Sequence, residues 1–359
     1  MDIGTEHSHR RFNPLLDEWV LVSPQRHARP WQGQIEAPEL EQSMEYDASC
    51  YLCPGNERAH GVRNPRYAST FAFDNDFGAL SRDSGLGGTR LGTRRATSPE
   101  LFLAHAERGL CRVLCFSPRH DLTLARMDTG DIRGVVDAWV DEYAAAAALP
   151  WARYALVFEN RGAMMGASNP HPHGQIWVTE SVPNEPARER DAFNRYRATH
   201  DACLLCDYLQ HEAHGRERLV CENTHFVAVV PFWAIWPFET LVLSRRHVST
   251  IDALNPVERD GLADMLKRLT TRYDNLFEAP FPYSMGVHQQ PMRETGQDWH
   301  LHAHFYPPLL RSATIRKFMV GFELLGSPQR DLSPEEAAAR LQALGDVHYR
   351  ARAGAGARA

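Results

Sequence analysis

The apolar residues of this chain follow a helical period in two long stretches. The first begins after Asp128, a suitable N-cap, and runs to about Ala148. The second begins after Asn255, where Pro256 takes the first helical position and Glu258 completes a capping box. The spacing predicts one apolar face on each helix. These faces comprise Ile132, Val135, Val136, Trp139, Val140 and Tyr143 in the first helix and Leu262, Met265, Leu266, Leu269, Tyr273 and Leu276 in the second.

Short apolar or alternating runs predict strands between and around these helices. Within residues 12–22 the pattern predicts a turn at Asn13-Pro14 followed by a first strand. The other predicted strands cover residues 71–77, 111–116, 154–158, 226–230, 239–243 and 283–288. Both halves of the chain then present the same order of features: a Cys-x-x-Cys pair, a strand that ends in a histidine, a capped helix, a strand and a histidine-rich strand. From His120 to His171 is 51 residues, and from His247 to His300 is 53. Such a match indicates an internal repeat.

The repeat predicts the fold class and the division of the chain. We expect an α+β fold made of a duplicated unit, with antiparallel sheets and one main helix per half. The N-terminal half would cover residues 1–190 and the C-terminal half 191–350, while 351–359, rich in Ala, Gly and Arg, would be a disordered tail. The register pairs His171 with His300, His173 with His302 and Gln175 with His304.

Composition and charge exclude several classes of protein. Of 359 residues, 43% are hydrophobic and 23% charged, as in ordinary soluble globular proteins. The net charge of −6 leaves no basic surplus for nucleic acid, so we expect no such partner. No run of about 18 apolar residues predicts a membrane span, and the N-terminus lacks a signal-peptide pattern. A cytoplasmic protein is expected.

Cysteines and histidines supply three candidate metal groups. Four of the seven cysteines form two Cys-x-x-Cys pairs, which in a reducing compartment indicate zinc rather than disulfides. The first predicted group is a closed structural zinc site. The repeat predicts a second group of the same kind. The alternative is that this group is a relic of the duplication that binds no metal and packs as a small apolar knuckle. A third group has three histidines and needs a carboxylate that spacing alone does not identify. The groups are Cys50, Cys53, His120 and His171; Cys203, Cys206, His247 and His300; and His288, His302 and His304.

Residues 168–177 carry the densest candidate chemistry. On a strand, His171, His173 and Gln175 would share one face, where buried imidazoles and amides need polar partners. A neutral histidine can act as a metal ligand or as a nucleophile. The alternative is a turn followed by a strand with surface histidines.

The chain resembles the galactose-1-phosphate uridylyltransferases, a branch of the histidine triad superfamily, from Phe12 to about Arg350. The resemblance rests on four motifs. They are Gly166-x-Ser168-Asn169-Pro170-His171-Pro172-His173-Gly174-Gln175, Pro237-Phe238-Glu239-Thr240, His302-Ala303-His304-Phe305-Tyr306-Pro307-Pro308 and Arg316-Lys317-Phe318-Met319-Val320-Gly321.

The resemblance implies an enzyme that moves a uridylyl group from UDP-glucose to galactose 1-phosphate in two displacements. His173 would be the nucleophile, and Gln175 and Ser168 would complete the catalytic set. Glu189 would join the third metal group, which would hold iron or zinc. The resemblance also implies a homodimer with shared active sites. Substrate contacts would come from Arg26, Arg29, Asn75, Asp76, Asn160, Gly166, Ala167, Ser168 and Gln175, and from a sugar-binding segment with Lys317, Phe318, Phe322, Glu323 and Gln329.

Two positions depart from the family pattern. Ala167 stands where many members have cysteine, and Phe322 replaces a tyrosine, which removes a hydroxyl near the sugar. A related enzyme that acts on another nucleotide sugar, such as an ADP-glucose phosphorylase, is therefore an alternative hypothesis. A non-catalytic nucleotide-binding or metal-storage protein is a third, which the intact His173 and Gln175 disfavour.

Overall fold

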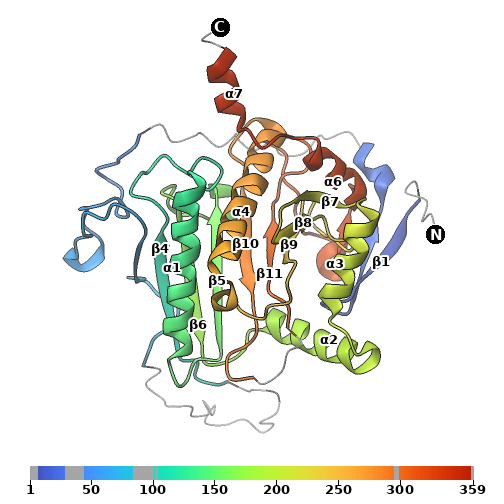
Figure 1. Cartoon of the computed structure of the whole chain (residues 1–359), viewed down its shortest axis with the longest axis horizontal. Coiled ribbons are helices and arrows are strands. Elements are labelled where there is room, and N and C mark those ends of the chain that lie inside the picture. Colours follow the sequence, from blue (N-terminus) through green and yellow to red (C-terminus); the bar gives the residue numbers. More distant parts are fainter. Residues whose placement is uncertain (1–6, 29–43, 84–100, 102–103, 295–298, 357–359) are drawn as a thin grey trace.

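The structure, a computed structural model, describes residues 7–28, 44–83, 101, 104–294 and 299–356. Among these residues, nine strands form one sheet in the order β3-β4-β6-β5-β10-β11-β9-β8-β7, with every neighbouring pair antiparallel (Figure 1). The strands are β3 (Phe71–Asp74), β4 (Gly109–Cys115), β5 (Tyr154–Arg161), β6 (His173–Thr179), β7 (Leu219–Glu222), β8 (Phe226–Val229), β9 (Thr240–Ser244), β10 (Tyr283–His288) and β11 (His302–Tyr306).

The strand order is symmetric about the centre of the sheet. The central pair is β5 and β10, one from each half of the chain, and outward from it β6-β4-β3 on one side corresponds to β11-β9-β8 on the other. The strand β7 extends the second side without a counterpart. The predicted α+β class with a duplicated unit is therefore confirmed.

The two predicted main helices cover one face of this sheet. They are α1 (Thr129–Ala147) and α4 (Pro256–Phe277), which pack side by side (Figure 1). Asn255 caps α4 in a complete capping box with Glu258, as predicted, whereas the side chain of Asp128 makes no cap hydrogen bond to α1. The predicted apolar faces of both helices join the largest hydrophobic cluster, which also takes alternate residues from the strands. This cluster is the main core.

The opposite face carries further elements, most of which the apolar patterns did not predict. These are α2 (Asn184–His200), α3 (Leu204–Gly215) and a small sheet of β1 (His9–Asn13), β2 (Glu18–Val22) and β12 (Gln329–Arg330). The turn predicted at Asn13-Pro14 lies at residues 14–17, where Asn13 accepts a hydrogen bond from the amide of Leu15 and Asp17 takes a left-handed conformation. The strand predicted after it is β2, and the residues before the turn form a second strand, β1, that pairs with it. A second cluster packs α3 against β8 and β9 here.

The C-terminal part adds short helices, α5 (Phe322–Leu325), α6 (Pro334–Gln342) and α7 (Tyr349–Gly356). The last differs from the prediction of a disordered tail from residue 351. Alanine and arginine, which made the segment look featureless, are also good helix formers. Residues 357–359 lie outside the described part. No helix in the described ranges is long and apolar enough to cross a membrane.

Candidate active site and metal centres

The predicted site residues that stand on strands of the large sheet lie on the face opposite α1 and α4. Residues directly paired across neighbouring strands point to the same face. Cys115 pairs with His173, Gln175 with Phe158, and Phe158 with Gly286. The same face continues through the pairs Gly286–His304 and His288–His302. The main core therefore lies on one side of the sheet and these site residues on the other.

His173, at the first position of β6, is braced by the backbone of the preceding histidine. Its Nδ1 donates to the carbonyl oxygen of His171 at 2.7 Å. A neutral ring that donates through Nδ1 carries its lone pair on Nε2. Burial lowers the pKa of His173, which favours this neutral form. The ring is thus held with the lone pair of Nε2 free, the state that the predicted role as a nucleophile requires.

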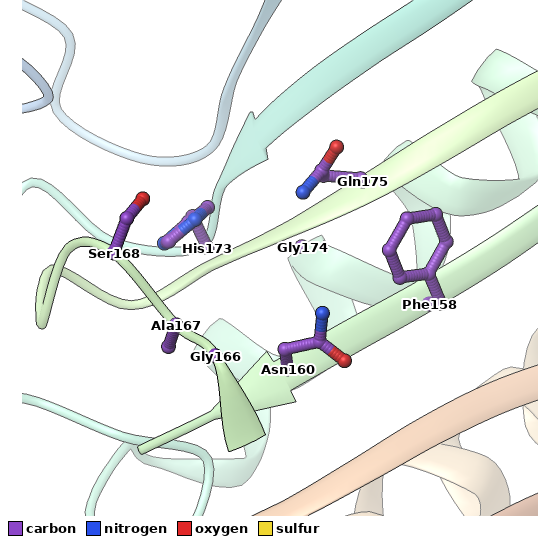
Figure 2. Close-up of a pocket in the computed structure, with 8 residues that line it drawn as sticks. All are labelled: Phe158, Asn160, Gly166, Ala167, Ser168, His173, Gly174 and Gln175. Carbon is purple, nitrogen blue, oxygen red and sulfur yellow. The ribbon is translucent and has the colours of Figure 1, made fainter. Parts of the chain in front are cut away.

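A pocket opens beside this histidine. Its volume is about 500 Å³, and its walls come from the first Cys-x-x-Cys loop, β3 and β6. Figure 2 shows Ser168, from the loop before β6, close to His173, and Gln175 further along the same strand. Ser168 and Gln175 line the pocket together with His173. The structure therefore brings the three predicted catalytic residues together.

Neighbouring side chains leave amide N–H groups available in the pocket. The Trp177 indole donates to Oε1 of Gln175 at 2.9 Å, so the Gln175 amide group keeps its two N–H donors. Likewise Ser284 donates to Oδ1 of Asn160 at 2.7 Å. Gly166, which lies near Asn160 in Figure 2, is left-handed with φ of 78° and ends a short turn. The pocket, and a small recess next to it that Asn160, Gly166 and Gln175 line, therefore present hydrogen-bond donors suited to an anionic ligand.

Only glycine fits between His173 and Gln175. A Cβ at Gly174 would lie 2.9 Å from the ring of Phe116 and 2.9 Å from the carbonyl oxygen of Phe158. The close approach lets β6 pack against β5 while its two flanking polar side chains face the pocket.

Four residues of the N-terminal half form the first knuckle: Cys50, Cys53, His120 and His171. All four are buried, and their ligand atoms lie within 4.8 Å of one another. The Nδ1 atoms of both histidines are 3.6 Å from the Cys53 sulfur. Burial lowers the pKa of His171 to about 4, so its ring stays neutral and able to bind a metal.

The second knuckle comprises Cys203, Cys206, His247 and His300. Its ligand atoms also lie within 4.8 Å of one another. The Cys206 sulfur is 3.3 Å from Nδ1 of both histidines. The repeat thus predicts correctly which four residues meet.

The third cluster, here named the Glu189 group, comprises Glu189, His288, His302 and His304. Glu189 is supplied by α2 and is almost fully buried; its carboxylate contacts Nδ1 of His288 at 2.7 Å and Nε2 of His304 at 3.1 Å. Burial by itself would raise the pKa of Glu189, but His288 and His302 outweigh it, and the pKa lies well below its usual value. A buried carboxylate among three imidazoles is a set of donors that suits zinc or iron.

The segment predicted to bind the sugar forms a separate pocket of about 430 Å³. Lys317, Phe318, Phe322, Glu323 and Gln329 line it. Arg26 lies there too, 3.2 Å from Asp331, and not beside His173. Arg29 lies outside the described residues. Asn75 and Asp76 line the His173 pocket, where Asp76 pairs with Arg58 at 3.0 Å.

Several residues of the site escaped sequence reasoning. The Asn169 side chain accepts a hydrogen bond from the backbone amide of His171 at 2.9 Å and lies 3.5 Å from the Cys50 sulfur. It therefore links the first knuckle to the loop that precedes His173. Phe73, which lines the pocket, could have been found, because it shares the strand alternation with Asn75. The hydrogen bond from the Trp177 indole to Gln175 could not be predicted, because the sequence shows only that the two residues are two positions apart on a strand.

Comparisons with known proteins agree with this geometry. The family models for the N-terminal and C-terminal domains of galactose-1-phosphate uridyl transferase match residues 2–183 and 189–353. The chain belongs to the galactose-1-phosphate uridylyltransferase family. A Haemophilus influenzae protein of that name is 50% identical over 97% of both chains.

Solved structures have the same fold. A uridylyltransferase structure is 28% identical, with a TM-score of 0.73 over 93% of this chain and 97% of that one. An ADP-glucose phosphorylase from Arabidopsis thaliana has a TM-score of 0.74 over 94% and 99% of the two chains, but at 23% identity this likeness concerns the fold alone.

Proposed function

We propose that this protein transfers the uridylyl group of UDP-glucose to galactose 1-phosphate, giving UDP-galactose and glucose 1-phosphate. Membership of the uridylyltransferase family supports the reaction. The single observation that carries the mechanism is the hydrogen bond from His173 Nδ1 to the carbonyl of His171, because it leaves Nε2 as the nucleophile.

The reaction proceeds in two displacements at phosphorus. In the first, Nε2 of His173 forms a bond to the α-phosphorus of UDP-glucose, and the bond to the glucose 1-phosphate oxygen breaks. In the second, a phosphate oxygen of galactose 1-phosphate attacks the same phosphorus, and the bond to nitrogen breaks. Nδ1–H remains on the carbonyl of His171 and supports the positive charge on the ring in the intermediate.

The pocket around His173 supplies the other roles. The free amide N–H groups of Gln175 and the hydroxyl of Ser168 would donate to phosphoryl oxygens as charge develops on them. Phe73 and Val113 offer apolar surface for the base, and Asn75 and Asp76 offer acceptors for ribose hydroxyls. The backbone at Gly166 and Ala167 lines the small recess at the phosphate position.

Two of the metal groups belong to this proposal. The first knuckle would hold a structural zinc, since two thiols and two neutral imidazoles fill a tetrahedral site. The Glu189 group would hold zinc or iron. The observation that supports a metal ion here is the buried Nε2 of His302, which makes no hydrogen bond within the described structure although it lies 3.5 Å from Glu189. A metal ion would give this nitrogen a partner. Both metals would fix the strands that carry the site.

Assembly and location complete the proposal. We expect a homodimer in which the sugar-binding segment reaches the partner's active site, and a cytoplasmic location. Exposed apolar side chains gather on this segment, with 55% of Val320, 56% of Phe322 and 91% of Leu325 exposed. Exposed patches of this kind mark interfaces.

The test follows glucose 1-phosphate after mixing with UDP-glucose alone. We expect one rapid equivalent per active site and then a stop, with steady turnover once galactose 1-phosphate is added. His173→Ala should give no burst, whereas His211→Ala, an exposed histidine on α3, should behave as the wild type. A burst with ADP-glucose and none with UDP-glucose, or turnover with inorganic phosphate as the acceptor, would instead favour a phosphorylase.

A further inference from the structure

We propose that the second knuckle (Cys203, Cys206, His247 and His300) binds a zinc ion that positions His302 of the Glu189 group. The sequence repeat suggested the four residues, but it left open whether they hold a metal or pack as an apolar relic. The structure adds two observations, the orientation of the imidazole rings and a hydrogen bond that links the second knuckle to the Glu189 group.

The first observation is that both imidazole rings turn the same nitrogen toward sulfur. Nδ1 of His247 and Nδ1 of His300 each lie 3.3 Å from the Cys206 sulfur, and Nδ1 of His300 lies 3.8 Å from that of Cys203. Apolar packing has no reason to aim two nitrogens and two sulfurs at one centre, since burying them without partners costs free energy. Two thiolates and two imidazoles at one point are the ligands of a tetrahedral zinc site.

The tautomer of His300 also suits a metal. The ring is fully buried, and its Nε2 lies 2.8 Å from the carbonyl oxygen of Ser244, which can only accept. The proton is therefore on Nε2, and the lone pair on Nδ1 faces the sulfurs. His171 repeats the arrangement in the first knuckle, where its Nε2 lies 2.9 Å from the carbonyl oxygen of Ser117. Each serine precedes the other knuckle histidine by three residues, so the same backbone feature sets both rings.

The second observation links the knuckle to the Glu189 group. The carbonyl oxygen of His300 accepts Nδ1–H of His302 at 2.7 Å. The bond from His173 to His171 has the same length and the same spacing of two. In the first half this bond leaves Nε2 of His173 for phosphorus, whereas in the second half it leaves Nε2 of His302 for the Glu189 group. One backbone device thus serves a nucleophile in one copy and a metal ligand in the other.

The consequence is a chain of contacts from one metal to the other. Zinc at the second knuckle would fix the ring and backbone of His300, and the carbonyl of His300 would fix the ring of His302. His302 is thereby a ligand whose orientation depends on an ion it does not touch. Loss of a contact that orients a metal ligand costs about 10- to 100-fold in metal affinity.

Metal content tests the site itself. The full-length protein, purified, stripped and resupplied with zinc, should hold three equivalents per chain by elemental analysis. Cys206→Ser should hold two, and Cys221→Ala, a buried cysteine outside all three groups, should hold three. Two equivalents in the wild type, with the same two in Cys206→Ser, would overturn the site. Three equivalents in the wild type support the site even if the variant folds poorly, since each of the three groups then holds one ion.

Metal release tests the link to His302, which rests on the proposed metal at the Glu189 group. A chelator should remove metal in separate phases, and the phase missing in His288→Ala belongs to the Glu189 group. In Cys206→Ser that phase should be about tenfold faster or more. An unchanged phase would overturn the link. No phase missing in His288→Ala would overturn the Glu189 metal and the link that rests on it. The second knuckle is then tested separately, by the part of the cobalt–thiolate absorption that Cys206→Ser loses and Cys221→Ala keeps.

Discussion

His173 donates its Nδ1–H to the carbonyl oxygen of His171, a residue two positions earlier whose own ring belongs to the first knuckle. The proposed nucleophile and the proposed structural ligand are thereby parts of one short segment. The knuckle fixes the backbone at His171, the backbone fixes the proton on Nδ1, and Nε2 is left for chemistry. In this account the knuckle is required for catalysis although it lies outside the reaction.

Gln175 depends on Trp177 for its orientation. The Trp177 indole can only donate a hydrogen bond, so its partner is the amide oxygen of Gln175. The N–H groups of Gln175 are therefore left to face the pocket. We predict that Gln175→Ala lowers kcat on the order of 100-fold, the effect of losing an oxyanion donor. Trp177→Phe should lower kcat by only about two- to tenfold, the worth of one net hydrogen bond. Steady-state kinetics with both substrates measures this, and equal losses in the two variants would contradict the division of roles.

Gly174 sets the distance between β6 and its neighbours. Gly174→Ala should lower the free energy of unfolding by about 1–3 kcal/mol, because its Cβ meets the Phe116 ring and the carbonyl of Phe158. The matched control is Gly134→Ala in α1, where nothing lies within 4 Å of the added carbon. That variant should be more stable than the wild type by about 0.5–1 kcal/mol. Denaturant unfolding compares them, and a neutral Gly174→Ala would refute the close packing.

Glu159 gives the stability a specific pH dependence. Burial raises its pKa to about 7, above the ordinary value of 4.5, and its carboxyl group accepts the hydroxyl of Tyr283 at 2.9 Å. The stability that comes from the protonated form is fully present below pH 4.5 and is lost as the pH rises through 7. Glu159→Gln should therefore gain stability over the wild type by on the order of 1–3 kcal/mol between pH 5.5 and pH 8.

The control for this pH effect is Glu217→Gln, whose carboxylate is exposed. Thermal unfolding at several pH values should show a difference from the wild type that grows with pH for Glu159→Gln only. A difference that shrinks as the pH rises would reverse the sign and contradict the account.

The sequence was informative where chemistry repeats along the chain. The helical periods of α1 and α4, the capping box at Asn255 and the recurrence of Cys-x-x-Cys with two histidines are local or periodic signals. They predicted the fold class and which residues meet in both knuckles. The roles assigned to these residues stay predictions until they are measured.

The remaining features depend on contacts distant in sequence. The helix α2 has few buried apolar residues, so it has no apolar period, and only the family resemblance pointed to its Glu189. The separation of Arg26 from the His173 pocket follows from the pairing of β2 with β12, more than 300 positions along the chain. In the α7 helix Tyr349 is half-buried and residues 350–352 are exposed, so these positions give no apolar pattern.

The central claim is that His173 carries the uridylyl group between the two displacements. The most direct measurement is peptide mass spectrometry of the protein quenched after mixing with UDP-glucose alone. We predict one uridylyl group on the peptide that contains His173, lost on addition of galactose 1-phosphate and absent from His173→Ala. A uridylyl group on another residue, or product formation without any modified peptide, would contradict the account.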